Sequence, residues 1–169
     1  MKSAIYFFTI VIAILCFSCN MKTEDVLITS DISIKFPSDY TLKEKNDPSG
    51  IISYEAKNKE GKFLAAVVPV QGFDTLNLNQ KQDWLRENIQ GYINGFNGQQ
   101  ISISDSDSEK LLSTKFIFEH SKNDTSYISH SQILMTEDEM IVIMYETSKP
   151  ETSQAIKEKD NFFKSLEIR

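Results

Sequence analysis

The distribution of apolar residues constrains the fold more than any other feature of the sequence. Apolar and polar side chains alternate in several short segments, which places one face of a β-strand against a core. In the segment 32–36, Ile32, Ile34 and Phe36 share one face. The same analysis predicts strands over residues 52–56, 63–68, 112–118, 127–135 and 140–145, a weaker strand at 101–103, and turns at 46–50, 58–61, 104–109, 121–124 and 136–139.

Two segments have helical spacing instead. The first is predicted over residues 79–95, where Leu85, Ile89 and Ile93 recur on one side. Asn79 is its predicted N-cap, and Gln82 three residues later is expected to complete a capping box. The second helix is predicted over residues 150–164, with a capping box from Ser148 to Glu151 and Pro150 in the first turn.

The order of these elements is strands, helix, antiparallel meander, helix. This order is typical of the α+β class, in which helices pack against an antiparallel sheet. The sequence shows no internal repeat and no low-complexity segment, so we expect a single domain over residues 31–169, which is an ordinary domain size.

The charge balance excludes one class of partner. The chain has 169 residues, 18 Lys and Arg against 24 Asp and Glu, and a formal net charge of -6. Nucleic acids are bound through basic patches that neutralise phosphates. The acidic balance and the lack of a basic run therefore predict no nucleic-acid partner.

The N-terminus has the three parts of a secretory signal. Lys2 is followed by an uncharged apolar stretch over residues 4–17, and the small Ser18 then precedes Cys19. The apolar stretch is shorter than the roughly 20 residues that a membrane-spanning helix needs. We therefore predict a signal peptide over residues 1–18.

A cysteine directly after a small residue at the end of such a stretch resembles a lipobox. The resemblance is to the relaxed lipoboxes of Bacteroidetes-type lipoproteins, with Leu15 one place earlier than usual and Phe17 where a small residue is common. It implies that Cys19 is lipidated. The alternative is an ordinary signal cleaved near Ser18 that leaves Cys19 as a free thiol.

Cys16 and Cys19 also have C-x-x-C spacing, but a redox pair needs a folded βαβ context that a cleaved segment lacks.

Residues 19–30 are predicted to be a lipid-anchored tether. Lys22, Glu24 and Asp25 resemble a surface-export tag of some Bacteroidetes lipoproteins, and a plain polar linker explains them equally well. We expect the protein in the cell envelope, at the outer membrane, with its lipid anchor as the membrane contact.

Two further motifs resemble those of PsbP-like and DcrB-like domains. Residues 32–40 match the opening strand, Phe-Pro and aromatic motif, and residues 162–168 match the closing helix-to-strand motif. The helix around Trp84 falls where these domains have their first long helix. The resemblance implies an antiparallel sheet with helices on both faces. Because the family's members share a fold and little chemistry, it implies no site residue.

Residues that carry chemistry are few. His120 and His130 are expected to lie too far apart along their hairpin to share a metal, with His130 opposite a residue near Lys115. The acids in the segment 105–109 lack the central glycine of a calcium loop, and those in 137–139 are expected at a hairpin tip. We therefore expect no catalytic residue, no metal and no cofactor.

Two features of the first predicted helix remain. Gly91 and Gly95 have the spacing of a helix-dimer motif, but that motif belongs to apolar membrane spans. Trp84 is expected to anchor the edge of the core.

The sequence predicts a non-enzymatic envelope lipoprotein that binds an unknown envelope protein. The alternative is a small-ligand or lipid carrier with a pocket lined by Phe63, Trp84 and Phe116, and a hydrolytic enzyme is the third possibility.

Overall fold

The computed structural model describes residues 23–37, 41–107 and 111–169. Within these residues the chain forms two sheets, in which every paired neighbour is antiparallel. The larger sheet has the order β3 (Lys43–Asn46), β4 (Ile52–Lys57), β5 (Lys62–Pro69), β9 (Glu139–Ser148), β8 (Thr125–Met135), β7 (Leu112–Lys122) and β6 (Gln99–Asp107). The smaller sheet has the order β1 (Thr23–Leu27), β2 (Ile32–Pro37) and β10 (Glu167–Ile168).

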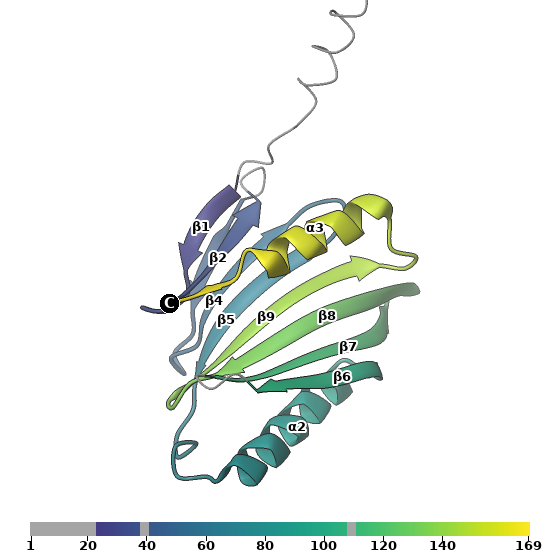
Figure 1. Cartoon of the computed structure of the whole chain (residues 1–169). Helices are drawn as coiled ribbons and strands as arrows, with labels where there is room; N and C mark the ends of the chain where they lie inside the picture. Colours follow the sequence, from purple (N-terminus) through teal and green to yellow (C-terminus); the bar gives the residue numbers. More distant parts are fainter. Residues whose placement is uncertain (1–22, 38–40, 108–110) are drawn as a thin grey trace, which may run out of the picture.

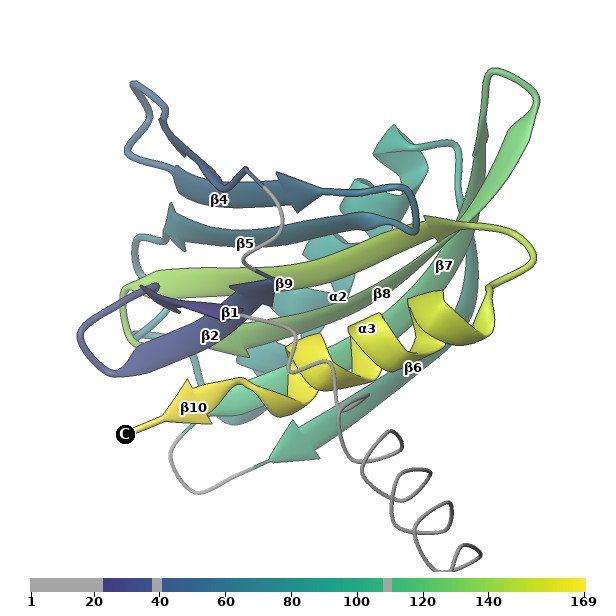
Figure 2. The same cartoon turned by 90° about the horizontal axis from the view of Figure 1, so that it is seen from above.

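The two helices of the described residues lie on opposite faces of the larger sheet (Figure 1). Helix α2 (Leu78–Gly95) covers one face, whereas α3 (Ser153–Lys164) covers the other. The small sheet lies beside α3 over the same face (Figure 2). The α+β class predicted from the order of elements is confirmed, as are the helices on both faces that the PsbP-like resemblance implies (Figure 1).

Each face of the sheet has its own core, because side chains alternate along every strand. Ile34, Phe63 and Phe162 belong to the core beneath α3 and the small sheet. Leu85 and Phe116 belong to the core beneath α2. The central strands β5 and β9 are covered on both faces, which explains why their sequences are almost continuously apolar.

Both helices begin at different residues from those predicted. The N-cap of α2 is Asn77, whose side chain accepts from the N–H of Gln80 while the Gln80 side chain accepts from the N–H of Asn77. Asn79 therefore lies inside the first turn. The N-cap of α3 is Thr152. Ser148, which was predicted to begin the capping box, still belongs to β9 and cannot cap the helix. The predictions failed because asparagine and serine side chains are frequent near both ends, and several satisfy the capping pattern.

The polar turn predicted at residues 104–109 is wrong in its first part, because β6 continues to Asp107. Asp105 accepts from Thr114 Oγ1 at 2.8 Å and from Arg86 Nη2 at 2.7 Å. These partners stabilise a carboxylate inside a strand. Arg86 in turn lowers the pKa of Asp105 through its hydrogen bond. Residues 108–110 lie outside the described residues.

The N-terminal part of the chain joins the fold earlier than predicted. Residues 23–27 form β1, which pairs with β2, and Val26 is buried in the core. The tether expected over residues 19–30 is therefore replaced by folded chain from residue 23 onward. The signal peptide predicted over residues 1–18 and Cys19 lie outside the described residues. None of the helices in the described ranges has the length and apolar character to cross a membrane.

Candidate functional site

An open cleft of about 990 Å³ lies at one end of the larger sheet, on the face that α2 covers. The turn between β4 and β5 and the turn between β7 and β8 form two of its sides, and the last residues of α2 form another. Its floor comes from Leu64, Met144 and Glu146 on the central strands; Tyr92 projects from α2, and Phe96 is the C-cap of that helix. Surface of this size and concavity is typical of ligand sites.

A buried histidine–carboxylate pair lies in this cleft. His120 Nε2 and Glu146 Oε2 are 2.9 Å apart, and the His120 side chain is only 4% exposed. Strand register brings them together: His120 is opposite Tyr127 on β8, and Glu146 is opposite Ser129 on the same strand. Because a carboxylate only accepts hydrogen bonds, His120 donates from Nε2. The Tyr127 ring stacks on the imidazole at 5.4 Å and 16°.

The contacts of His120 limit what the pair can do chemically. In the described part of the chain, the hydrogen bond recorded for its imidazole is to a carboxylate and not to a hydroxyl or thiol. Nucleophilic hydrolases need a base beside the nucleophile. Ser129 Oγ instead donates to Glu146, at 3.5 Å. The pair therefore has the arrangement of a buried polar anchor.

Tyr92 closes the cleft on the helix side. Its hydroxyl donates to Met144 Sδ at 3.3 Å, and a thioether is a weak acceptor. Burial, followed by the charge of Glu146, raises the pKa of Tyr92 to about 12. The phenol therefore stays protonated at neutral pH and keeps its donor.

Lysines surround the opening of the cleft. Lys62 lies 3.5 Å from Glu55, and Lys59 lies 3.6 Å from Glu60. The other two, Lys57 and Lys122, are exposed and form no ion pair within the described residues. These four lysines outnumber Glu60 and Glu146, the two carboxylates that also line the cleft, so the lining is locally positive in a chain of net charge -6. A concave site with such a rim attracts anions.

The turn between β4 and β5 approaches β9 closely at Gly61. A Cβ there would lie 2.6 Å from the backbone oxygen of Glu146 and 2.8 Å from the ring of Tyr145. Only glycine fits this approach. The turn, which also carries Lys59, is thereby held against the strand that carries Glu146.

A second, apolar pocket of about 470 Å³ lies between α2 and the sheet. Phe116, Ile133, Met140 and Val142 form its wall on the sheet, and Glu87, Asn88 and Gly91 form its border on the helix. Tyr92 lines this pocket as well as the lysine-rimmed cleft.

The pocket predicted from Phe63, Trp84 and Phe116 does not exist in that form. Phe63 faces α3, where its ring lies 5.1 Å from that of Phe162. Phe116 faces α2 on the opposite side of the sheet. Trp84 packs on Phe73 at 5.4 Å at the edge of that core, in the anchoring position predicted for it. The prediction failed because the strand that carries Phe63 is apolar on both faces.

The two histidines lie on opposite faces of the sheet. His130 is opposite Ile117, two residues from Lys115, in agreement with the prediction of a partner near Lys115. Its Nε2 lies 3.0 Å from Glu151 Oε1 at the start of α3. Burial, followed by the positive charge of Lys159, lowers the pKa of His130. Because the sheet separates it from His120, the two cannot share a ligand.

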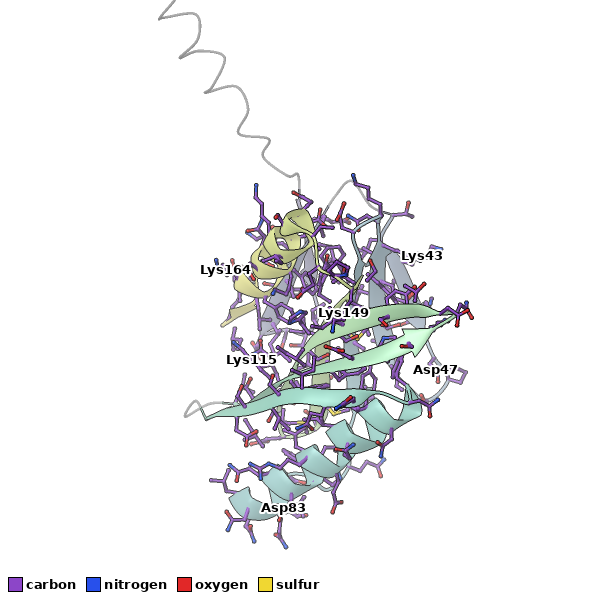
Figure 3. The ribbon with its side chains drawn as sticks, turned by 90° about the vertical axis from the view of Figure 1, so that its right-hand side faces the viewer. Lys43, Asp47, Asp83, Lys115, Lys149 and Lys164 are labelled. Atoms are coloured by element: carbon purple, nitrogen blue, oxygen red, sulfur yellow. The ribbon has the colours of Figure 1, made fainter. Side chains whose placement is uncertain are left out.

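Sequence reasoning did not find the cleft. The clearest indication of the cleft in the sequence is Glu146, a carboxylate directly after the apolar run 140–145 of a central strand. The lysines come from two turns that are distant in sequence, so spacing alone does not connect them. Figure 3 shows that Lys164 on α3 and Asp83 on α2 lie on opposite sides of the sheet, so Lys164 is remote from the face that carries the cleft.

No family model and no curated protein matches the chain. Solved structures do match it along nearly its whole length. Cyanobacterial PsbP (CyanoP) from Synechocystis sp. PCC 6803 is 8% identical, covers 90% of this chain and 96% of its own, and has a TM-score of 0.64. The chain has a PsbP-like fold.

Two other proteins share this PsbP-like fold. LpqN of Mycobacterium tuberculosis is 11% identical, with 93% of this chain and 96% of its own covered and a TM-score of 0.54. The Saccharomyces cerevisiae Ran-binding protein Mog1p is 10% identical, with 88% and 96% covered and a TM-score of 0.53. At these identities the likeness concerns the PsbP-like fold alone.

Proposed function

We propose that this protein is a non-enzymatic binding module of the cell envelope, which a lipid on Cys19 holds at the membrane. Its binding site is the lysine-rimmed cleft. The observation that carries the proposal is that Lys57 and Lys122 are exposed at the opening of a large cleft without an ionic partner in the described residues. Such a rim favours an anionic ligand over a neutral one.

Two further observations support this function. Mog1p is described as a Ran-binding protein, and LpqN as involved in cell envelope biogenesis, so the fold occurs in binding and envelope proteins. The imidazole of His120 is hydrogen-bonded to a carboxylate, which suits a rigid floor better than a catalytic base.

The proposal is tested by site-specific photo-crosslinking in intact cells. A benzophenone amino acid replaces Lys122 at the cleft in the full chain, and a matched chain carries it at Lys164 on the remote helix. We expect an adduct from position 122 only, seen as a mass increase of the purified protein. Charge reversal at Lys57 (Lys57→Glu) should reduce that adduct severalfold. Equal labelling from both positions, or none from position 122, would contradict the proposal.

A further inference from the structure

Two lysines lie directly opposite each other at the closed end of the β4–β5 hairpin. Lys57 of β4 pairs with Lys62 of β5, so their side chains share one face of the sheet, and both line the cleft. Like charges in directly opposite positions destabilise a sheet. Lys62 Nζ lies 3.5 Å from Glu55 Oε1, whereas Lys57 is exposed and forms no ion pair within the described residues. An anion between the two ammonium groups would offset their repulsion.

The neighbouring strands add to the positive charge of this pair. Strand register places Lys43 and Lys45 of β3 on the same face of the sheet. Two carboxylates share this part of the face: Glu55, which lies 3.0 Å from Lys45 Nζ, and Glu146, which is opposite Lys62. Among the described residues of these strands, four lysines therefore face two carboxylates. The excess of positive charge at a concave surface attracts anions.

The turn that joins the two opposed lysines is fixed by side-chain hydrogen bonds. Asn58 Oδ1 accepts from the backbone N–H groups of Glu60 at 2.8 Å and Gly61 at 2.7 Å. Asn58 Nδ2 donates to Glu158 Oε2 on α3 at 3.0 Å, and Thr152 Oγ1 donates to Glu60 Oε2 at 2.6 Å. Because Glu158 is only 4% exposed, α3 holds the turn from inside the fold. The backbone that carries both lysines is thereby preorganised, which reduces the entropy that a ligand must overcome on binding.

The type of cation indicates the type of anion. Within the described residues, the lining of the cleft contains lysines and no arginine; Arg86 pairs with Asp105 at 2.7 Å, and Arg169 lines another pocket. Arginine has a planar fork that matches a carboxylate, whereas lysine is a point charge that commonly binds phosphate. A phosphate monoester has a charge of about −1.5 to −2 at pH 7 and three acceptor oxygens. One such group balances two lysines, and a carboxylate balances only one.

We propose that Lys57 and Lys62 together bind one phosphate monoester group, an inference that rests on the proposed binding function. The phosphate lies between the two ammonium groups at the edge of the cleft, and each lysine donates to one of its oxygens. A soluble phosphate ester and a lipid headgroup both present this group.

The soluble source is tested by calorimetric titration of the full chain, held in phosphatidylcholine nanodiscs, with glycerol 3-phosphate. We expect saturable binding that glycerol does not show and that acetate shows more weakly. Lys57→Gln or Lys62→Gln should lower the affinity at least about fivefold, because each removes one charge at contact distance. Lys164→Gln is the control and should leave it unchanged, since Lys164 lies on the opposite side of the molecule from Lys43 (Figure 3).

The lipid source is tested with the Cys19→Ala chain, which lacks the proposed anchor, and with sedimented vesicles. Phosphatidic acid presents a phosphate monoester, whereas phosphatidylglycerol presents only a diester. If a headgroup is the ligand, vesicles of phosphatidylcholine with phosphatidic acid should bind the protein more tightly than vesicles with phosphatidylglycerol at equal surface charge. Lys57→Gln should remove this difference, and Lys164→Gln should preserve it.

Unfolding temperatures separate lost binding from lost folding. Without ligand, Lys57→Gln should unfold at the same temperature as the unmodified sequence or at a higher one, because the repulsion from Lys62 is removed. A saturating concentration of glycerol 3-phosphate should raise the unfolding temperature of the unmodified sequence and of Lys164→Gln, since a ligand that binds the folded state stabilises it. The increase should be smaller for Lys57→Gln.

Two results would overturn this inference. One is the absence of both saturable binding of glycerol 3-phosphate and selective binding of phosphatidic acid. The other is binding that Lys57→Gln and Lys62→Gln leave unchanged. If either is found while position 122 still yields an adduct in cells, the proposed binding function stands and the phosphate inference alone fails; if position 122 yields none, both fail.

Discussion

At the scale of single residues, two histidines with similar sequence surroundings have different roles. His120 forms part of the cleft floor with Glu146, whereas His130 lies under α3 beside Glu151. Both imidazoles have a carboxylate partner, yet burial and Lys159 together outweigh that partner for His130 and lower its pKa. The position of each side chain on one face or the other decides the difference.

We expect His130 to make the protein sensitive to mild acid. The ordinary pKa of a histidine is 6.5; in the folded chain burial and then Lys159 lower the pKa of His130 by more than Glu151 and Asp160 raise it. Below pH 6.5 the unfolded state binds a proton that the folded state does not, so stability falls as pH decreases toward the folded pKa. His130→Asn should reduce the difference in unfolding free energy between pH 7 and pH 5.5. An unchanged difference in denaturant titrations would contradict this.

At the scale of the elements, the start of α2 depends on one hydrogen-bonded pair. Asn77 and Gln80 satisfy each other's backbone N–H groups, whereas the exposed Asn79 is not the cap. The local sequence allows either asparagine to begin the helix. The segment 72–76, in which Phe73 is buried under α2, fixes where the chain enters the helix. Asn77 and not Asn79 is therefore the N-cap.

Alanine substitutions at the two asparagines should separate these alternatives. Asn77→Ala should lower the free energy of unfolding by about 1 kcal/mol because a capping side chain is lost. Asn79→Ala should be neutral or slightly stabilising, since alanine favours helix interiors. Chemical denaturation monitored through Trp84 fluorescence measures both. A larger loss from Asn79→Ala than from Asn77→Ala would contradict the observed cap.

At the scale of the whole molecule, the folded unit and the proposed anchor are separable. The described residues from 23 onward have two cores of their own, one on each face of the larger sheet. Within the described residues, the first member of either core is Val26. The proposed lipid would therefore determine location and not stability.

Cys19→Ala tests this separation. The variant should lose acyl labelling in cells fed an alkyne fatty acid and should move to the soluble fraction. Its unfolding temperature should equal that of the lipidated chain within about 1 °C, because the described residues from 23 onward supply two cores of their own. A membrane-bound variant, or one that still carries the label, would contradict the lipoprotein proposal.

The strands and the fold class were predictable because they depend on local periodicity. Alternation in β2 and the continuous apolar runs of β5 and β9 are visible in the sequence, and both follow from which faces are covered. Helix caps were less predictable, since polar residues near Asn77 and Thr152 offer several equivalent patterns. The cleft was not predictable, because its residues come from β5, β7, β9 and α2.

The sequence by itself determined the class of fold, the acidic charge and the place of the proposed anchor at Cys19. These depend on composition, periodicity and short motifs, which are local properties. Only the tertiary structure placed His120 against Glu146, put Lys57 and Lys122 on the rim of one cleft, and gave Tyr92 a part in the lining of both a polar and an apolar pocket. Those arrangements depend on strand register and on which face each helix covers, and neither is encoded by nearest neighbours in the chain.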